Sequence, residues 1–130
     1  MNSIIGEHFN AIEARLLQSL VVVSYRILRR EIALADGKLR IQATLSDKSI
    51  IELFEYVIEV NAQVCLVKYS FHWQDAQSKL RRRWDNAPHH LELTSAPHHV
   101  HNSDGTVQSV EEVPDMFQVI TEIEGSLRQT

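Results

Sequence analysis

The chain has 130 residues, of which 44% are hydrophobic and 23% are charged, and its formal net charge is −4. This length fits one domain, residues 1–130, and the composition excludes a disordered or low-complexity chain. A single cysteine, Cys65, excludes an internal disulfide and a zinc site built on a CxxC pair. The N-terminal residues do not have the pattern of a signal peptide, and no apolar run is long enough to span a membrane. We therefore expect a cytoplasmic protein with no membrane partner.

Two segments have helical periodicity. Residues 4–17 place apolar side chains at spacings of three and four, and Ser3 is the expected N-cap of this helix. One histidine, His8, is expected on its surface. Residues 113–127 carry one apolar stripe, and Pro114 suits the first turn of a helix because its missing N–H costs nothing there.

Five strands are predicted between the two helices. They cover residues 20–32, 39–45, 50–60, 63–74 and 79–85. The pair Asp36-Gly37 predicts a hairpin turn, since it tolerates positive φ, and Asn61-Ala62 predicts a second short turn. Residues 50–60 also fit a helix, but their β-branched and aromatic side chains favour a strand. Cys65 is interpreted as a small buried hydrophobe in a strand.

The order helix, five strands, loop and helix predicts an α+β protein. Its antiparallel five-stranded meander sheet should carry the N-terminal and C-terminal helices on one face. Residues 86–111 are expected to form a long irregular loop, because they contain Pro88, Pro97 and the turn former Asp104-Gly105; such loops are often functional. The strand at 20–32 could pair with a second copy, so a homo-oligomer stays open, although its arginines are typical of a protected sheet edge.

Histidines are concentrated in one part of the chain. Six of the seven fall within residues 72–101, where an even distribution would place one or two. Histidine is the side chain whose ordinary pKa, about 6.5, suits proton transfer near neutrality. The concentration therefore predicts a functional segment. The six are His72, His89, His90, His98, His99 and His101.

The last two predicted strands should form a hairpin with one apolar and one cationic face. If the turn holds an even number of residues, His72 lies opposite Arg81, Ser70 opposite Arg83 and Lys68 opposite Asp85. The apolar face carries Tyr69, Phe71, Trp73, Leu80 and Trp84, with Arg82 as an exception. The other face carries Lys68, Ser70, His72, Gln74, Lys79, Arg81, Arg83 and Asp85.

This face leads into the histidine-rich segment, and three interpretations of the two together stay open. The histidines could be hydrogen-bonding residues of a surface loop. They could bind a metal, since His98 and His101 offer two imidazoles, although adjacent His-His pairs diverge. They could also form an acid–base site on a phosphodiester, where arginine stabilises charge and His or Asp takes a proton. RNA supplies its own 2′-hydroxyl, so the last interpretation requires no metal or other cofactor.

Three segments resemble the TumE family of type II toxin–antitoxin systems. They are YSFHWQ at residues 69–74, RWDNAPHH at 83–90 and APHHVH at 96–101. The resemblance runs from about Leu39 to the C-terminal helix. It departs from the family at Leu91, where proline is frequent, and at Ala96, where an aromatic residue is frequent. The resemblance implies a toxin that is neutralised by a cognate antitoxin, a DNA-binding protein encoded beside it.

The resulting hypothesis is a toxin that acts on RNA as a metal-independent endoribonuclease. Two alternatives stay open: a non-enzymatic module that docks an acidic or nucleic-acid partner, and a metal-dependent hydrolase with histidine ligands. The candidate catalytic residues are His72, Asp85, His89, His90, His98 and His99. Lys68, Arg81 and Arg83 are the candidate phosphate-binding or RNA-binding residues, and Asn86, His101 and Tyr69 are supporting residues.

Overall fold

The computed structural model describes residues 3–128, which contain two helices and seven strands. The helices are α1 (Ile4–Gln18) and α2 (Met116–Arg128). The first four strands are β1 (Val22–Ile32), β2 (Asp36–Leu45), β3 (Ile50–Val60) and β4 (Gln63–Gln74). The last three are β5 (Leu80–Asp85), β6 (His99–Asn102) and β7 (Val107–Gln108).

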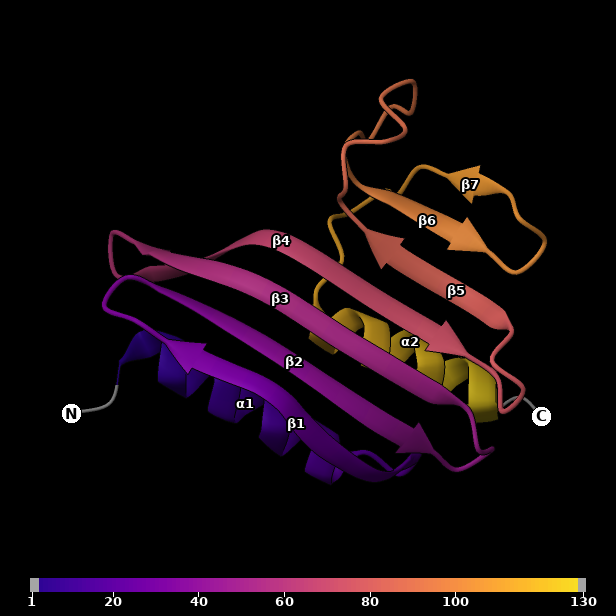
Figure 1. Ribbon diagram of the computed structural model, residues 1–130, viewed down its shortest axis with the longest axis horizontal. Helices are drawn as coiled ribbons and strands as arrows, with labels where there is room; N and C mark the ends of the chain where they lie inside the picture. Colours follow the sequence, from indigo (N-terminus) through magenta and orange to yellow (C-terminus); the bar gives the residue numbers. More distant parts are fainter. Residues whose placement is uncertain (1–2, 129–130) are drawn as a thin grey trace.

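The strands form one antiparallel sheet in chain order, from β1 at one edge to β7 at the other. Both helices lie on the same face of this sheet, and the opposite face is open (Figure 1). The predicted α+β class and the antiparallel meander are confirmed. The predicted number of five strands is wrong, because the sheet has seven.

The two additional strands lie within residues 86–111, which the sequence predicted as an irregular loop. β6 has four residues and β7 has two. Segments this short, one of them with two histidines, carry too little alternation to be recognised, and it is their pairing with β5 that makes them strands. The predicted turn at Asp104-Gly105 does reverse the chain between them, with Gly105 at a φ of 88°.

A side chain caps the first turn of each helix and so fixes the residue at which the helix begins. The hydroxyl of Ser3 accepts from the amide of Gly6 at 2.9 Å, as predicted. Asp115 has the same role for α2, since its carboxylate accepts from the amide of Gln118 at 2.8 Å. Pro114 therefore precedes the cap instead of lying in the first turn. Within residues 3–128, no helix combines the length and hydropathy that a membrane span requires.

One of the two predicted hairpin turns is wrong. Asp36 and Gly37 belong to β2, and the chain reverses before them, at residues 33–35. Gly37 is needed for close packing instead, because a Cβ at this position would lie 2.7 Å from Cγ2 of Ile5 in α1. The Asn61-Ala62 turn is confirmed, with φ values of 52° and 62°.

A single hydrophobic core lies between the helices and the sheet. The alternation predicted for β2 places Leu39, Ile41 and Ala43 in it, each fully buried. His8 is not a surface residue as predicted. Its Nε2 lies 2.6 Å from the carboxylate of Glu55, which is itself buried on the helix-covered face of β3. Cys65 lies in β4, as expected, but is only half-buried.

Candidate functional site

The open face of β4 and β5 carries the predicted cationic residues, but with a different register. His72 lies opposite Arg83 and Ser70 opposite Asp85, two residues away from the predicted pairing. The turn and a bulge each contribute one residue to this difference. At the turn, Gln74 pairs with Leu80 instead of Lys79, and β5 then holds one extra residue, Arg81, between the partners of Trp73 and Gln74. At residues 82–85, beyond the bulge, a shift of two residues leaves each side chain on its predicted face, so the division into an apolar and a polar face is retained there. Before the bulge, Leu80 lies opposite Gln74 and so changes face.

Strand β6 extends this polar face by two histidines. His101 lies opposite Arg83 and His99 opposite Asp85, while Val100 between them is buried in the core. His72, Arg83 and His101 therefore form a row across β4, β5 and β6. The sequence prediction treated the histidines of residues 96–101 as a loop, and only strand pairing gives them this place.

Asp85 is the centre of the polar network. Its Oδ2 accepts from Nε of Arg83 at 2.9 Å, and its Oδ1 accepts from the amide of Ala87 at 3.0 Å and lies 2.9 Å from Nε2 of His99. Burial alone would raise the pKa of Asp85, but the hydrogen bonds from Arg83 and Ala87 outweigh it and hold this pKa below its usual range. A buried carboxylate with three partners orients its neighbours and is a poor proton acceptor.

Arg83 also contacts His72. Its Nη1 lies 3.2 Å from Nδ1 of His72, and since arginine can only donate, Nδ1 accepts and the neutral ring carries its proton on Nε2. Burial, together with the positive charge of Arg83, lowers the pKa of His72. The imidazole is therefore mainly neutral at pH 7 and able to accept a proton.

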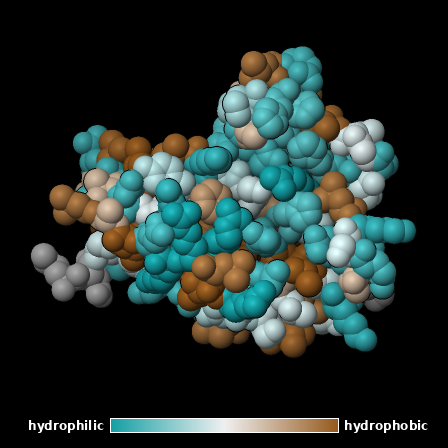
Figure 2. Space-filling view, viewed as in Figure 1, coloured by the Kyte–Doolittle hydropathy of each residue, from teal (hydrophilic) through white to brown (hydrophobic). Residues whose placement is uncertain are grey.

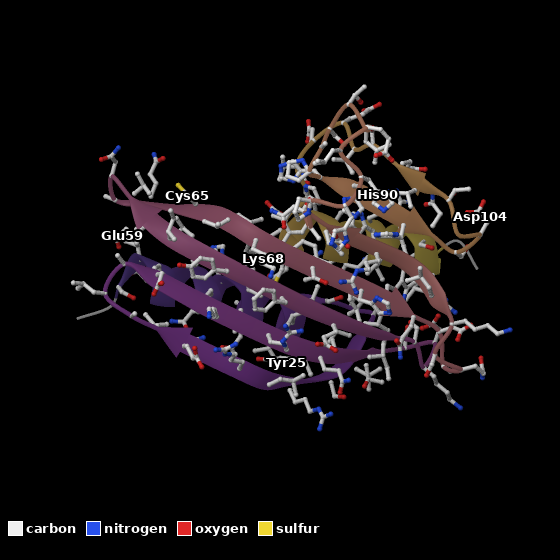
Figure 3. The ribbon with its side chains drawn as sticks, turned by 45° about the horizontal axis from the view of Figure 1, so that its top comes forward. Tyr25, Glu59, Cys65, Lys68, His90 and Asp104 are labelled. Atoms are coloured by element: carbon white, nitrogen blue, oxygen red, sulfur yellow. The ribbon has the colours of Figure 1, made fainter. Side chains whose placement is uncertain are left out.

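A groove of about 870 Å³ lies on the open face of the sheet, with His72 and Arg83 in its lining. Five cations line it against two anions, Asp36 and Glu52, so the groove is basic in a chain whose formal net charge is −4. Figure 2 shows the hydrophilic side chains gathered on this face, and Figure 3 labels Lys68, which lies on β4. The five cations are Arg29, Lys38, Arg40, Lys68 and Arg83.

Two aromatic rings lie among these cations. The guanidinium of Arg40 lies 4.5 Å from the ring centre of Phe54, and the ammonium of Lys38 lies 5.7 Å from that of Tyr56. The sequence-based prediction missed these groove residues. The signal was present, because Lys38 and Arg40 alternate with buried residues of β2 and must share the exposed face.

A second group of functional side chains lies beside the groove. His90, His99 and His101 each offer a ring nitrogen, and these nitrogens lie within 4.8 Å of one another. His99 is buried, and burial lowers the pKa of His101. Among residues 3–128, these three histidines are the group that could hold a metal ion. Figure 3 labels His90, in the loop beside β5 and β6.

Arg81, a predicted phosphate ligand, is not brought to the groove. It is the extra residue of the bulge, and its guanidinium pairs with Asp47 and lies 5.1 Å from the ring centre of Trp73. These contacts connect the β2–β3 turn to the end of β4. Arg81 therefore holds two segments of the fold together and does not line the groove.

Three further predicted residues also lie apart from the network around Asp85. Nδ1 of His98 lies 3.0 Å from the hydroxyl of Tyr69, whose side chain is buried among the core residues. Asn86 clamps β4, accepting from the amide of Tyr69 and donating to the carbonyl of Val67. His89 is exposed in the loop. The supporting roles of Asn86 and Tyr69 stay predictions.

Fold and site together define a small α+β protein whose open sheet face holds a basic groove and a cluster of histidines. A family model described as Toxin TumE matches residues 11–130. The chain therefore belongs to the TumE toxin family, as the resemblance at residues 69–101 predicted, and this membership supports a toxin role with a cognate antitoxin as partner. No curated protein and no solved structure matches the chain.

Proposed function

We propose that this toxin binds single-stranded RNA across the open face of its sheet and cleaves it without a metal in the reaction. The observation that supports this proposal is the position of His72 and Arg83 in a basic groove that also contains aromatic rings. Cations that follow a phosphate backbone, with rings on which bases stack, are typical of single-stranded nucleic-acid sites. Arg83 and Lys68 bind the phosphate, and Asp85 orients Arg83.

In the proposed reaction the ribose 2′-oxygen attacks the adjacent phosphorus, forming a 2′,3′-cyclic phosphate, and the 5′-oxygen leaves. Phosphate binding draws the guanidinium of Arg83 away from Nδ1 of His72. This nitrogen then accepts the proton of the 2′-hydroxyl, and the ring returns a proton to the leaving oxygen. Arg83 stabilises the charge that develops on the non-bridging oxygens.

The test has a cellular and a chemical part. Expression without an antitoxin should stop bacterial growth, and His72→Ala or Arg83→Ala should relieve the arrest. Purified protein should produce cyclic phosphate ends on RNA and leave DNA of the same sequence intact, with the rate about 10²–10⁴-fold lower in His72→Ala. Arg81→Ala is the matched control, since this arginine lies on the same strand but outside the groove; it should remain toxic.

The competing function is a non-enzymatic docking module. Binding of RNA without cleavage, together with normal growth and intact transcripts, would support it and exclude the nuclease. We further propose that the antitoxin is the DNA-binding protein encoded beside this gene and that it covers the basic groove. The antitoxin complex should then lose RNA binding, and Arg83→Ala should weaken the complex.

A further inference from the structure

The histidine cluster beside the groove is a site that RNA cleavage does not use. Two of its members, His99 and His101, are two residues apart on β6 and point to the same face, and His90 comes from the preceding loop. The three rings meet edge to face, with centres 4.8–5.6 Å apart. Three imidazole rings from two segments lie this close together only if protons or an ion between their nitrogens offset the repulsion of the lone pairs.

The hydrogen bonds of His99 indicate which of its ring nitrogens carries a proton and which faces the other rings. Its Nδ1 lies 2.8 Å from the carbonyl oxygen of Pro97, and because a carbonyl only accepts, Nδ1 carries a proton. In a neutral ring Nε2 then has a lone pair, yet it lies 2.9 Å from the carboxylate of Asp85 and 3.1 Å from Nε2 of His101. The lone pairs of His99 Nε2 and of the Asp85 carboxylate repel at this distance unless a proton or a metal ion lies between them, whereas a neutral His101 can carry a hydrogen on Nε2 and donate it to His99.

Either a second proton on His99 or a metal ion can supply this positive charge. The ring of His99 is only 1% exposed, so protein atoms enclose the group that lies between these rings. A metal ion can bind all three imidazoles at once, whereas a proton on Nε2 of His99 reaches Asp85 and His101 but not His90, whose Nδ1 lies 3.5 Å from the carboxylate of Glu92. The carboxylate of Asp85, with its Oδ2 3.5 Å from Nε2 of His101, neutralises part of the ion's charge.

We propose that His90, His99 and His101 bind one divalent transition-metal ion, with zinc as the best fit. Neutral imidazole nitrogens are ordinary zinc ligands, and two of them at about 2.0–2.1 Å from a tetrahedral ion are separated by about 3.3 Å, close to the spacing of His99 and His101. The carbonyl of Pro97 fixes the ring of His99 from the other side, as a supporting partner of a metal ligand does.

The ion would have a structural consequence for the neighbouring groove. It ties the loop that carries His90 to β6, and it fixes Asp85, which holds Arg83 at the groove. The metal-site proposal does not depend on RNA cleavage, because its three ligands are not among the residues that the proposed reaction uses. Loss of the ion should therefore loosen the loop whatever reaction the groove performs.

Titration of zinc chloride into tag-free, chelator-treated protein tests the proposal by calorimetry. We expect one zinc per chain and a rise in Tm. His90→Ala and His101→Ala, both partly exposed and thus able to fold, should each lose more than the roughly 10–100-fold in affinity that removal of a supporting partner costs. His89→Ala, the exposed neighbour of His90, is the matched control and should bind zinc like the parent chain.

Two results would overturn the metal site. One is the absence of zinc binding at micromolar concentration by folded parent protein, with NMR showing both ring nitrogens of His99 protonated, which identifies the buried imidazolium. The other is binding that persists in both single variants. Failure of RNA cleavage leaves the site unaffected, because zinc binding and Tm are measured without RNA.

Discussion

At the scale of single residues, the orientation and protonation of several side chains depend on a neighbouring polar group. Asp85 holds Arg83, Arg83 sets the protonation of His72, and on the other face of the sheet Glu55 depends on His8. Arg83 and Asp85 are neighbours on β5, whereas the other two pairs join residues of different elements. Each one can be tested by removing one partner and measuring the other.

The pKa of His72 should lie below the ordinary value of about 6.5, because burial and the charge of Arg83 both disfavour the imidazolium. As the pH falls, the ring should therefore stay neutral to lower pH than a free histidine. NMR titration of the His72 ring measures this directly. In Arg83→Gln the pKa should rise; an unchanged value would show that Arg83 does not control the ring.

Removal of His8 should destabilise the fold, because it leaves the buried carboxylate of Glu55 without its partner. We expect His8→Ala to lower the free energy of unfolding by about 3 kcal/mol in urea denaturation. The double variant His8→Ala/Glu55→Gln should recover part of this loss, since a neutral amide is less costly to bury. A loss no larger than that of the exposed His89→Ala would contradict the role of the pair.

At the scale of elements, the position of α1 on the sheet depends on a missing side chain. Gly37 of β2 lies under the helix, where a Cβ would be 2.7 Å from Ile5 and 3.1 Å from Phe9. The sequence suggested a turn at this glycine because glycine permits positive φ. The structure uses the absence of a side chain instead, and this difference gives a clear substitution test.

Gly37→Ala should lower the free energy of unfolding by roughly 1–3 kcal/mol, because α1 must move away from the sheet. Gly125→Ala is the matched substitution in α2, where an added Cβ meets nothing within 4 Å. It should raise stability by up to about 1 kcal/mol through helix propensity. Chemical denaturation measures the free energy of unfolding of both variants. Changes of the same sign in the two variants would contradict the packing role of Gly37.

At the scale of the whole molecule, the core and the basic groove lie on opposite faces of the sheet. The helices cover one face of all the long strands, and the other face gathers cations from β1 to β5 in one groove. A homo-oligomer through the edge strand β1 stays a prediction. The groove itself implies a strong dependence of RNA binding on salt.

Binding of single-stranded RNA should weaken as salt increases, with a slope of log K against log salt of about −0.7 for each phosphate neutralised. Lys68→Ala should reduce the magnitude of this slope by roughly 0.7, because Lys68 lines the groove. Lys79→Ala, an exposed lysine of the β4–β5 turn, should leave it unchanged. Equal effects of both substitutions would mean that RNA does not lie in the groove.

The sequence by itself determined the faces of the strands, both helices and the toxin family. Side chains alternate along a strand whatever its partners are, so the apolar face of residues 69–73 and the cationic face with Lys68, His72 and Arg83 could be predicted. The period of the hydrophobic pattern likewise marked α1 and α2. Family membership rested on motifs, which are local in the chain.

Only the tertiary structure decided which polar residues meet. The turn before β5 and the bulge at Arg81 together moved the register by two residues, and β6, too short to be recognised as a strand, placed His99 and His101 beside Asp85. Such placements depend on hydrogen bonds between strands, whose partners are distant in the chain and leave no local pattern. For this reason the concentration of histidines could be recognised in the sequence, while their division into a groove residue, a cluster of three and other loop positions could not.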